Sequence, residues 1–223
     1  MLSQIIRFTL PPYLTISALE FLKLRQKVAA AGAVAQYYGY TLPTRKSPLP
    51  KKRHEICWAI HWPDLCDRRA VMTDLRSITT GDETSLLFKF TDTQLPELEK
   101  GLEAPICEFA CIRLADDAPL SDTALQRSMI KTYTDTYKML GFTGGNWGYS
   151  MNANESAGVP LRPASEDPIS EGERRLGVYF LGWESIELHQ DATETSAFAE
   201  EIDKLMPYFG NGTGAWYVSF KKY

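Results

Sequence analysis

The histidines are the residues in this chain best suited to acid–base chemistry near neutral pH, and His189 is the most promising of the three. His189 follows the segment 182–185 and lies about one turn into a predicted helix. The positive end of the helix dipole disfavours an imidazolium there, so a neutral imidazole is available as a general base. We therefore predict a catalytic role for His189. The alternative is an exposed helix residue with no role.

His61 is the second candidate, because it ends an apolar strand beside Trp62, where loops and helix starts converge on a cavity mouth. A half-buried histidine bonded to backbone is the alternative. Glu184, in the first turn before His189, is predicted to contact substrate or simply to cap the helix. No His-x-His or His-x-x-x-His spacing occurs, and no carboxylate–histidine pair stands out in the sequence, so we expect no metal.

Polar and aromatic side chains supply candidates for the wall of a pocket. Tyr149 can donate to a developing enolate and Asn146 can orient a carbonyl, which makes them candidate catalytic partners of His189. Asn146 could equally be a turn residue. Aromatic side chains are numerous, and an aromatic wall suits a planar ligand, although such stripes also form plain cores. The predicted substrate-binding aromatics are Tyr40, Trp62, Tyr133, Tyr137, Trp147, Trp183 and Trp216.

The elements that must position these residues occur twice along the chain. Residues 37–41 (YYGYT) are echoed by 146–150 (NWGYS), and residues 57–64 by 178–185, with Trp62 matching Trp183. Each half reads as strand, helix, strand, strand, helix, strand, which is the pattern of a duplicated unit.

A βαββαβ unit forms a four-stranded antiparallel sheet with both helices on one face, which leaves the other face apolar and uncovered. Two such units can cover each other face to face. We therefore predict an α+β fold in which two ferredoxin-like repeats, 1–94 and 105–223, are joined by a connector helix, 95–104, in one fused body. The segment 152–173 is expected to be an exposed loop, and 185–209 a helix with a break near Thr193.

Composition narrows the class of protein. The chain has 223 residues, is 44% hydrophobic and carries a formal net charge of −4. This size and composition can bury a full core, and the acidic balance argues against a nucleic-acid partner. We find no signal-peptide core, no membrane span and no phosphate-binding glycine loop, so a cytoplasmic protein without a membrane partner is expected.

The segment from Gly182 to His189, Gly-Trp-Glu-Ser-Ile-Glu-Leu-His, resembles the strand-to-helix signature of the dimeric α+β barrel superfamily, in particular its antibiotic-biosynthesis-monooxygenase-like members. The two halves would make this chain a tandem, single-chain pseudo-dimer. The first copy departs from the signature, with Pro63 in place of Glu184 and Arg68 in place of His189. A site of this type is therefore expected in the second copy.

The resemblance implies a cofactor-independent enzyme of polyketide-like or aromatic natural-product biosynthesis, acting by cyclisation, isomerisation, dehydration or oxygenation. His189 would be the base, and Tyr149 or Asn146 the oxyanion partner. The partner would be a hydrophobic, oxygenated small molecule; further homo-oligomer formation is left open. Two alternatives remain: a haem protein of the chlorite-dismutase or dye-decolourising type, and a barrel that binds a ligand without catalysis.

Overall fold

The computed structural model describes residues 1–43, 54–63, 69–161 and 168–223, and it contains two copies of one βαββαβ unit. The elements of the first copy are β1 (Leu2–Thr9), α1 (Leu19–Ala30), β2 (Ala35–Leu42), β3 (Glu55–Trp62), α2 (Arg69–Arg76) and β4 (Thr84–Lys89). Those of the second are β5 (Ile106–Arg113), α4 (Thr123–Thr134), β6 (Phe142–Tyr149), β8 (Leu176–Trp183), α5 (Ile186–Thr193), α6 (Ser196–Leu205) and β9 (Gly214–Val218). Between them lies α3 (Leu95–Glu103). The repeat order expected from the sequence is confirmed, while the boundaries 94/95 and 104/105 stay a prediction.

Shorter elements complete the chain. They are the two-residue strands β7 (Val159–Pro160) and β10 (Lys221–Lys222) and the single turns η1 (Asp135–Lys138), η2 (Glu171–Glu173) and η3 (Met206–Tyr208). None of the helices in the described ranges combines the length and apolar character needed to span a bilayer.

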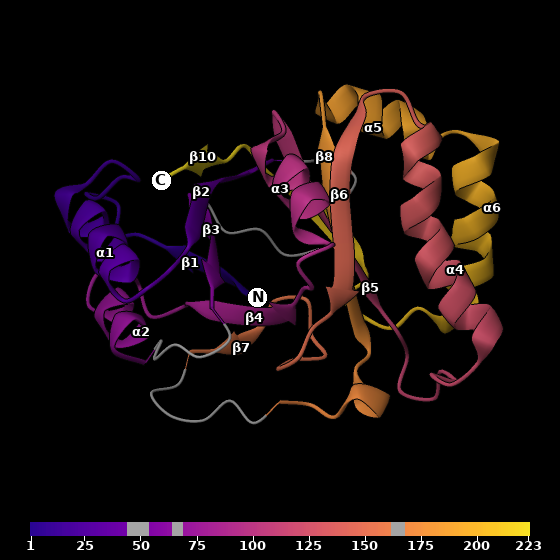
Figure 1. Cartoon of the computed structure of the whole chain (residues 1–223), viewed down its shortest axis with the longest axis horizontal. Helices are drawn as coiled ribbons and strands as arrows, with labels where there is room; N and C mark the ends of the chain where they lie inside the picture. Colours follow the sequence, from indigo (N-terminus) through magenta and orange to yellow (C-terminus); the bar gives the residue numbers. More distant parts are fainter. Residues whose placement is uncertain (44–53, 64–68, 162–167) are drawn as a thin grey trace.

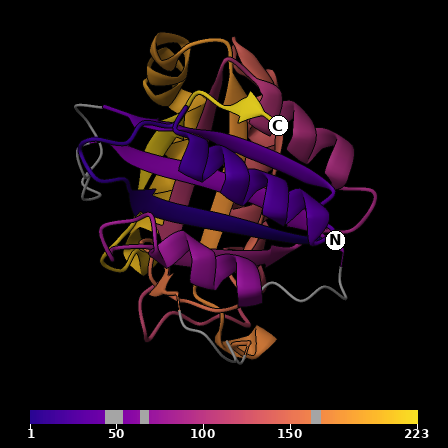
Figure 2. The same cartoon turned by 90° about the vertical axis from the view of Figure 1, so that its left-hand side faces the viewer.

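The strands form two antiparallel sheets that face each other, with α3 packed against the inner face of the second sheet and the other helices on the outside (Figures 1 and 2). The first sheet has the order β2-β3-β1-β4 and the second β6-β8-β5-β9, the same arrangement of equivalent strands. Helices α1 and α2 cover the outer face of the first sheet, and α4, α5 and α6 cover that of the second (Figure 1). This is the face-to-face α+β barrel that the duplication predicts.

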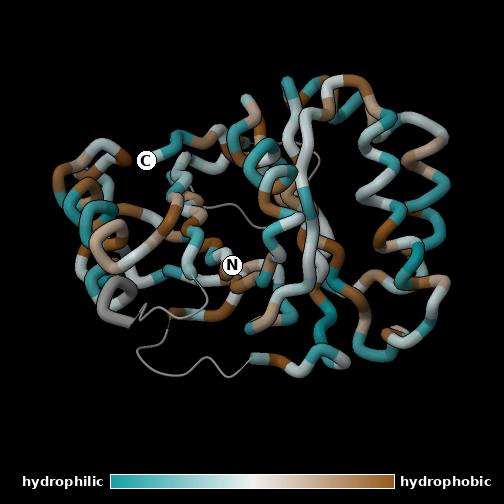
Figure 3. Tube along the Cα trace, in the orientation of Figure 1, coloured by the Kyte–Doolittle hydropathy of each residue, from teal (hydrophilic) through white to brown (hydrophobic). Residues whose placement is uncertain are grey.

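The central strand of each sheet is buried on both faces. Every residue of β3 and β8 is buried. In β8, Val178 and Phe180 point to the space between the sheets, whereas Tyr179, Leu181 and Trp183 pack under the helices. Alternation along a strand thus divides its side chains between two cores. Among the described residues, hydrophobic positions recur along both the strands and the helices (Figure 3).

The two sheets are joined at both edges. On one side, β2 pairs with β9 through Thr41 and Leu42, so the ten strands form one continuous sheet. On the other side, Asn152 replaces a strand pairing: its Oδ1 accepts from the Leu87 amide at 2.8 Å and its Nδ2 donates to the Ser85 carbonyl at 3.1 Å. The expectation of an exposed loop is therefore wrong at its start, because Asn152 is only 9% exposed and closes the barrel.

A candidate active site between the second sheet and its helices

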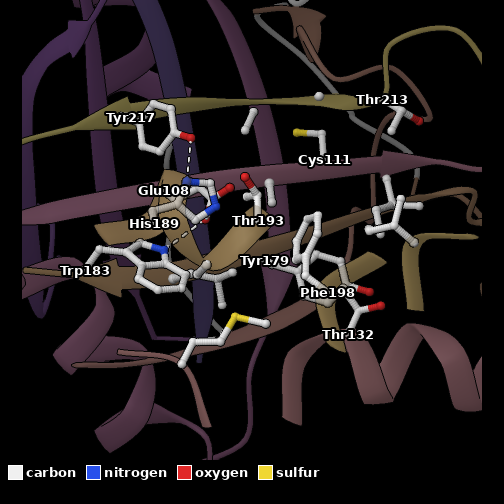
Figure 4. A pocket seen from close by; sticks show the side chains of 18 of the residues that line it. Glu108, Cys111, Thr132, Tyr179, Trp183, His189, Thr193, Phe198, Thr213 and Tyr217 are labelled. Carbon is white, nitrogen blue, oxygen red and sulfur yellow. Dashed lines mark hydrogen bonds and ion pairs between the residues drawn. The ribbon is translucent and has the colours of Figure 1, made fainter. Parts of the chain in front are cut away.

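A cavity of about 220 Å³ lies between the second sheet and helices α4–α6 (Figure 4). Its floor comes from β5, β8 and β9. Most of its lining is apolar, including Ile112, Leu181, Ala192, Phe198, Ile202 and Phe209. Three buried polar side chains meet at one end of it: Glu108, His189 and Tyr217, which are 3%, 7% and 5% exposed.

These three side chains form a chain of close polar contacts. Nε2 of His189 lies 3.1 Å from Oε2 of Glu108, and Nδ1 of His189 lies 2.8 Å from the Tyr217 hydroxyl oxygen. The same Glu108 oxygen accepts a hydrogen bond from Trp183 Nε1 at 2.9 Å. Trp183 also packs its ring against His189, with centroids 4.8 Å apart. The imidazole is therefore held on three sides.

The contacts imply a direction for the protons. An indole N–H can only donate, so the shared Glu108 oxygen acts as an acceptor. A carboxylate in that role is best matched by an N–H on Nε2 of His189, which leaves the Nδ1 lone pair facing Tyr217. The hydroxyl of Tyr217 then donates to Nδ1. A carboxylate that fixes the tautomer of a histidine, with a hydroxyl on its other nitrogen, is the arrangement of a proton relay.

Burial also determines how Tyr217 can react. Desolvation raises the pKa of Tyr217 above its ordinary value, and the charge of the nearby Glu108 raises it further. The side chain therefore stays a phenol rather than a free phenolate. It can accept a proton from a ligand only as it passes its own proton to His189.

Local structure positions each member of this group. Glu108 on β5 and Tyr217 on β9 are directly paired across the antiparallel ladder, so both side chains point to the helix side of the sheet. His189 is carried by α5, which begins after Ser185, whose hydroxyl accepts from the Leu188 amide at 3.2 Å. The break expected near Thr193 is confirmed, because Thr195 caps a new helix, α6.

The first copy provides an internal comparison. In β1, Gln4 occupies the place that Glu108 has in β5, and its Oε1 accepts from Trp62 Nε1 at 3.0 Å, just as Glu108 accepts from Trp183. The tryptophan contact is thus common to both copies, whereas the carboxylate belongs to the second alone. The residue that matches His189, Arg68, lies outside the described residues.

Of the residues predicted to form the site, the structure brings His189 and Trp183 together at the cavity. The expected partners on β6 lie elsewhere. The Tyr149 hydroxyl donates to Gln126 Oε1 at 3.2 Å, and Asn146 Oδ1 accepts from Gln94 at 3.1 Å on the opposite face of the sheet, beside α3. In the cavity, the hydroxyl that contacts His189 is that of Tyr217.

His61 also lies away from this cavity. The alternation along β3 turns His61 inward, toward the space between the sheets, while Trp62 packs under the helices of the first copy. Nδ1 of His61 lies 2.8 Å from the Ser3 hydroxyl, and its side chain is 1% exposed. Desolvation, with the charges of Lys222 and the N-terminal amine, lowers the pKa of His61 to about 4. It is a buried neutral imidazole rather than a residue at a cavity mouth.

The remaining aromatic candidates are not among the residues that line the cavity. Trp216 faces the space between the sheets, where it stacks on Phe109 with centroids 5.0 Å apart. Trp147 stacks on Tyr179 at 5.2 Å. The Tyr40 hydroxyl accepts from the Ile16 amide. The hydroxyl of Tyr133 donates to the Gly145 carbonyl, and that of Tyr137 donates to the Glu97 carboxylate. Glu184 is exposed, and its backbone amide donates to the Gly141 carbonyl at 2.8 Å.

Glu108 and Tyr217 are the two residues that sequence reasoning missed. Glu108 is the one acidic residue in the apolar run 106–112. Because side chains alternate along a strand, it shares the face of Ile106 and Ile112, and this charge among apolar neighbours was the signal in the sequence. Tyr217 is adjacent to Trp216, and the choice between them depended on the phase of the last strand. No carboxylate–histidine pair stood out in the sequence, and the fold brings one together in the Glu108–His189 contact.

Comparison with known proteins gives matches in structure alone. Neither the protein-family models nor the curated proteins searched include a match. A putative monooxygenase from Fusobacterium nucleatum is similar over 99% of this chain and 93% of its own, with a TM-score of 0.58 and 8% identity. A putative chlorite dismutase (TM-score 0.57, 12% identity) covers 99% of this chain and 94% of its own. An anthrone oxidase-like protein is similar over 100% of this chain and 92% of its own, with a TM-score of 0.55 and 9% identity. The fold is the ferredoxin-like dimeric α+β barrel. At these identities the likeness shows the fold and nothing finer.

The haem alternative expected from the sequence resemblance does not fit the contacts of His189. An axial histidine must offer a free ring nitrogen, but both nitrogens of His189 are engaged, by Glu108 and Tyr217. The cavity of about 220 Å³ is also below the roughly 300–1,000 Å³ usual for pockets that hold a drug-sized ligand.

Proposed function

We propose that the protein is an enzyme that abstracts a proton from a hydrophobic, oxygenated small molecule bound in the cavity of the second repeat. The observation that carries this proposal is the buried chain of contacts Glu108–His189–Tyr217 at the end of an apolar cavity. Convergent polar groups in an otherwise apolar pocket favour catalysis over a barrel that only binds.

The chemistry follows from the order of the three groups. A C–H beside a carbonyl, or an enolic O–H, would give its proton to the Tyr217 oxygen while the phenolic proton moves to His189 Nδ1. The imidazolium formed would be stabilised by Glu108 at 3.1 Å. The product of this step is an enolate, and proton return along the same path completes the cycle. Enolate formation is the step shared by the expected cyclisation, isomerisation, dehydration and oxygenation.

The size of the cavity narrows the substrate. A volume of about 220 Å³ suits one or two fused rings rather than a larger polycycle. The neighbours described as a monooxygenase and as anthrone oxidase-like support oxygenated ring compounds as the substrate class. A polyketide-like or aromatic natural-product pathway is the proposed setting, and homo-oligomer formation stays a prediction.

The test uses 2-tetralone, a bicyclic ketone with acidic hydrogens beside its carbonyl. In D2O, ¹H NMR follows the loss of these hydrogens as deuterium enters. We expect the wild-type protein to accelerate exchange above the buffer rate and His189→Gln to lose at least 100-fold of that acceleration. The matched control is His61→Gln, which alters a buried histidine outside the cavity. Equal loss in both variants, or no acceleration by the wild type, would contradict the proposal.

A further inference from the structure

A second hollow adjoins the catalytic cavity. It has a volume of about 720 Å³ and is lined by residues of three segments: the end of β5 and the turn after it, residues 155–157, and residues 209–213. Phe209 and Thr213 line both this hollow and the cavity that contains His189. These shared side chains place the two spaces next to each other, so a ligand longer than the cavity can extend past Phe209 into the hollow.

The reacting groups and the hollow lie at opposite ends of the same strand. Tyr217 is near one end of β9 and Thr213 directly precedes the other, and Figure 4 shows them at opposite sides of the cavity. Four residues of extended chain separate them, about 13 Å. The Thr213 hydroxyl contacts both the amide and the carbonyl of Arg113, each at 3.1 Å, which fixes this end.

The polar groups of the hollow indicate what they can bind. Its charged side chains are Arg113, Asp116 and Glu155, one cation against two carboxylates. The cation is already paired, because Arg113 Nη2 lies 2.7 Å from Asp116. An anionic group would therefore find no unpaired cation among the described side chains that line the hollow. Asn211 and Ser156 add neutral donors and acceptors, which match hydroxyl groups.

We propose that this hollow is a second subsite that binds the neutral, hydroxyl-bearing tail of an amphipathic substrate whose ring occupies the catalytic cavity. Phe209 is the partition between the two spaces and determines how well a tail passes. The inference rests on the proposed function, because it assumes that the ring reacts beside Tyr217.

Four ligands that share the same naphthol ring system test the inference through their dissociation constants, without any measurement of activity. They are 2-naphthol and three 6-substituted 2-naphthols whose tails span about 13 Å and are hydroxyl-bearing (an oligoethylene glycol), carboxylate-terminated or purely alkyl. Quenching of tryptophan fluorescence gives each Kd. We expect the hydroxyl-bearing ligand to bind about tenfold more tightly than 2-naphthol and than the carboxylate ligand. Asn211→Ala should remove that gain, whereas Asp117→Ala, an exposed position outside the hollow, should keep it.

The partition is tested with a matched pair of variants. For each variant we compare the Kd of the hydroxyl-bearing ligand with the Kd of 2-naphthol. Phe209→Ala should change the ratio of these two values by at least threefold. On a logarithmic scale, that is about half of the expected tenfold gain. Phe198→Ala, which lines only the cavity, should weaken both ligands equally. Binding of 2-naphthol without any gain from the hydroxyl tail, or tighter binding of the carboxylate, would overturn the subsite and leave the proposed function intact. Failure of all four ligands to bind would overturn both.

Discussion

Replacement of Glu108 by glutamine separates the structural role of this residue from its proposed chemical role. The amide oxygen can still accept from Trp183 Nε1, as Gln4 does from Trp62 in the first copy. The same oxygen contacts His189 Nε2, so it can also go on accepting from the imidazole. The tautomer is therefore kept, but the imidazolium formed when Tyr217 passes its proton to Nδ1 loses the negative charge that stabilises it.

The size of the effect follows from the loss of this charge. Stability should change by about 1–2 kcal/mol, because both hydrogen bonds keep their geometry and each becomes weaker without the charge. Proton transfer should fall by about 10²–10³-fold, because the imidazolium is no longer stabilised by a carboxylate while the cavity remains. Binding of 2-naphthol should stay within about twofold, since the apolar lining is untouched and hydrogen bonds to the ring hydroxyl contribute little net energy.

Deuterium exchange of 2-tetralone and thermal denaturation measure the two effects separately. Glu55→Gln serves as the control, because Glu55 is a buried carboxylate paired with Arg7 at 2.8 Å, away from the cavity. That variant should lose about 3 kcal/mol of stability and, at temperatures where it is folded, keep wild-type exchange. The reasoning is refuted if Glu108→Gln exchanges at the wild-type rate, or if it fails to fold while Glu55→Gln is stable.

Three further predictions concern other parts of the molecule. Tyr217→Phe should reduce exchange by about 100-fold, whereas Trp216→Phe, on the opposite face of β9, should cost stability and leave the exchange rate unchanged. Gly182→Ala should lower the free energy of unfolding by about 1–3 kcal/mol, because its Cβ would lie 2.4 Å from a β6 side-chain oxygen. Gly172→Ala meets nothing within 4 Å and should leave the denaturation midpoint unchanged. Because the folded-state pKa of His61 is lowered from 6.5 to about 4, the unfolded chain binds the proton first. Stability should therefore fall by about 3 kcal/mol as the pH drops from 6.5 to 4, and denaturation curves of His61→Gln that run parallel to wild type would contradict this.

The fold could be predicted because its signals repeat. The paired motifs around Trp62 and Trp183 revealed the duplication, and the fully apolar strand 176–183 indicated two covered faces. Both features depend on short-range periodicity, which a single sequence displays. The role of Asn152 could not be predicted, because it depends on bonds to Leu87 and Ser85 across the barrel.

The site could be predicted only in part, for the same reason. His189 and Trp183 belong to one local strand-to-helix motif, so they were found together. Glu108 lies 81 residues before His189, and their contact arises only when β5 and α5 are brought onto the same sheet face. Tyr217 was missed because one residue of strand phase decides whether it or Trp216 points to the helices.

A crystal structure with 2-naphthol, which resembles the enol of 2-tetralone, would test the central claim most directly. The account predicts that the ring lies between the second sheet and helices α4–α6, with its hydroxyl within hydrogen-bond distance of Tyr217 or His189. A ring bound only in the first repeat or on the outer surface, with Glu108, His189 and Tyr217 untouched, would contradict it.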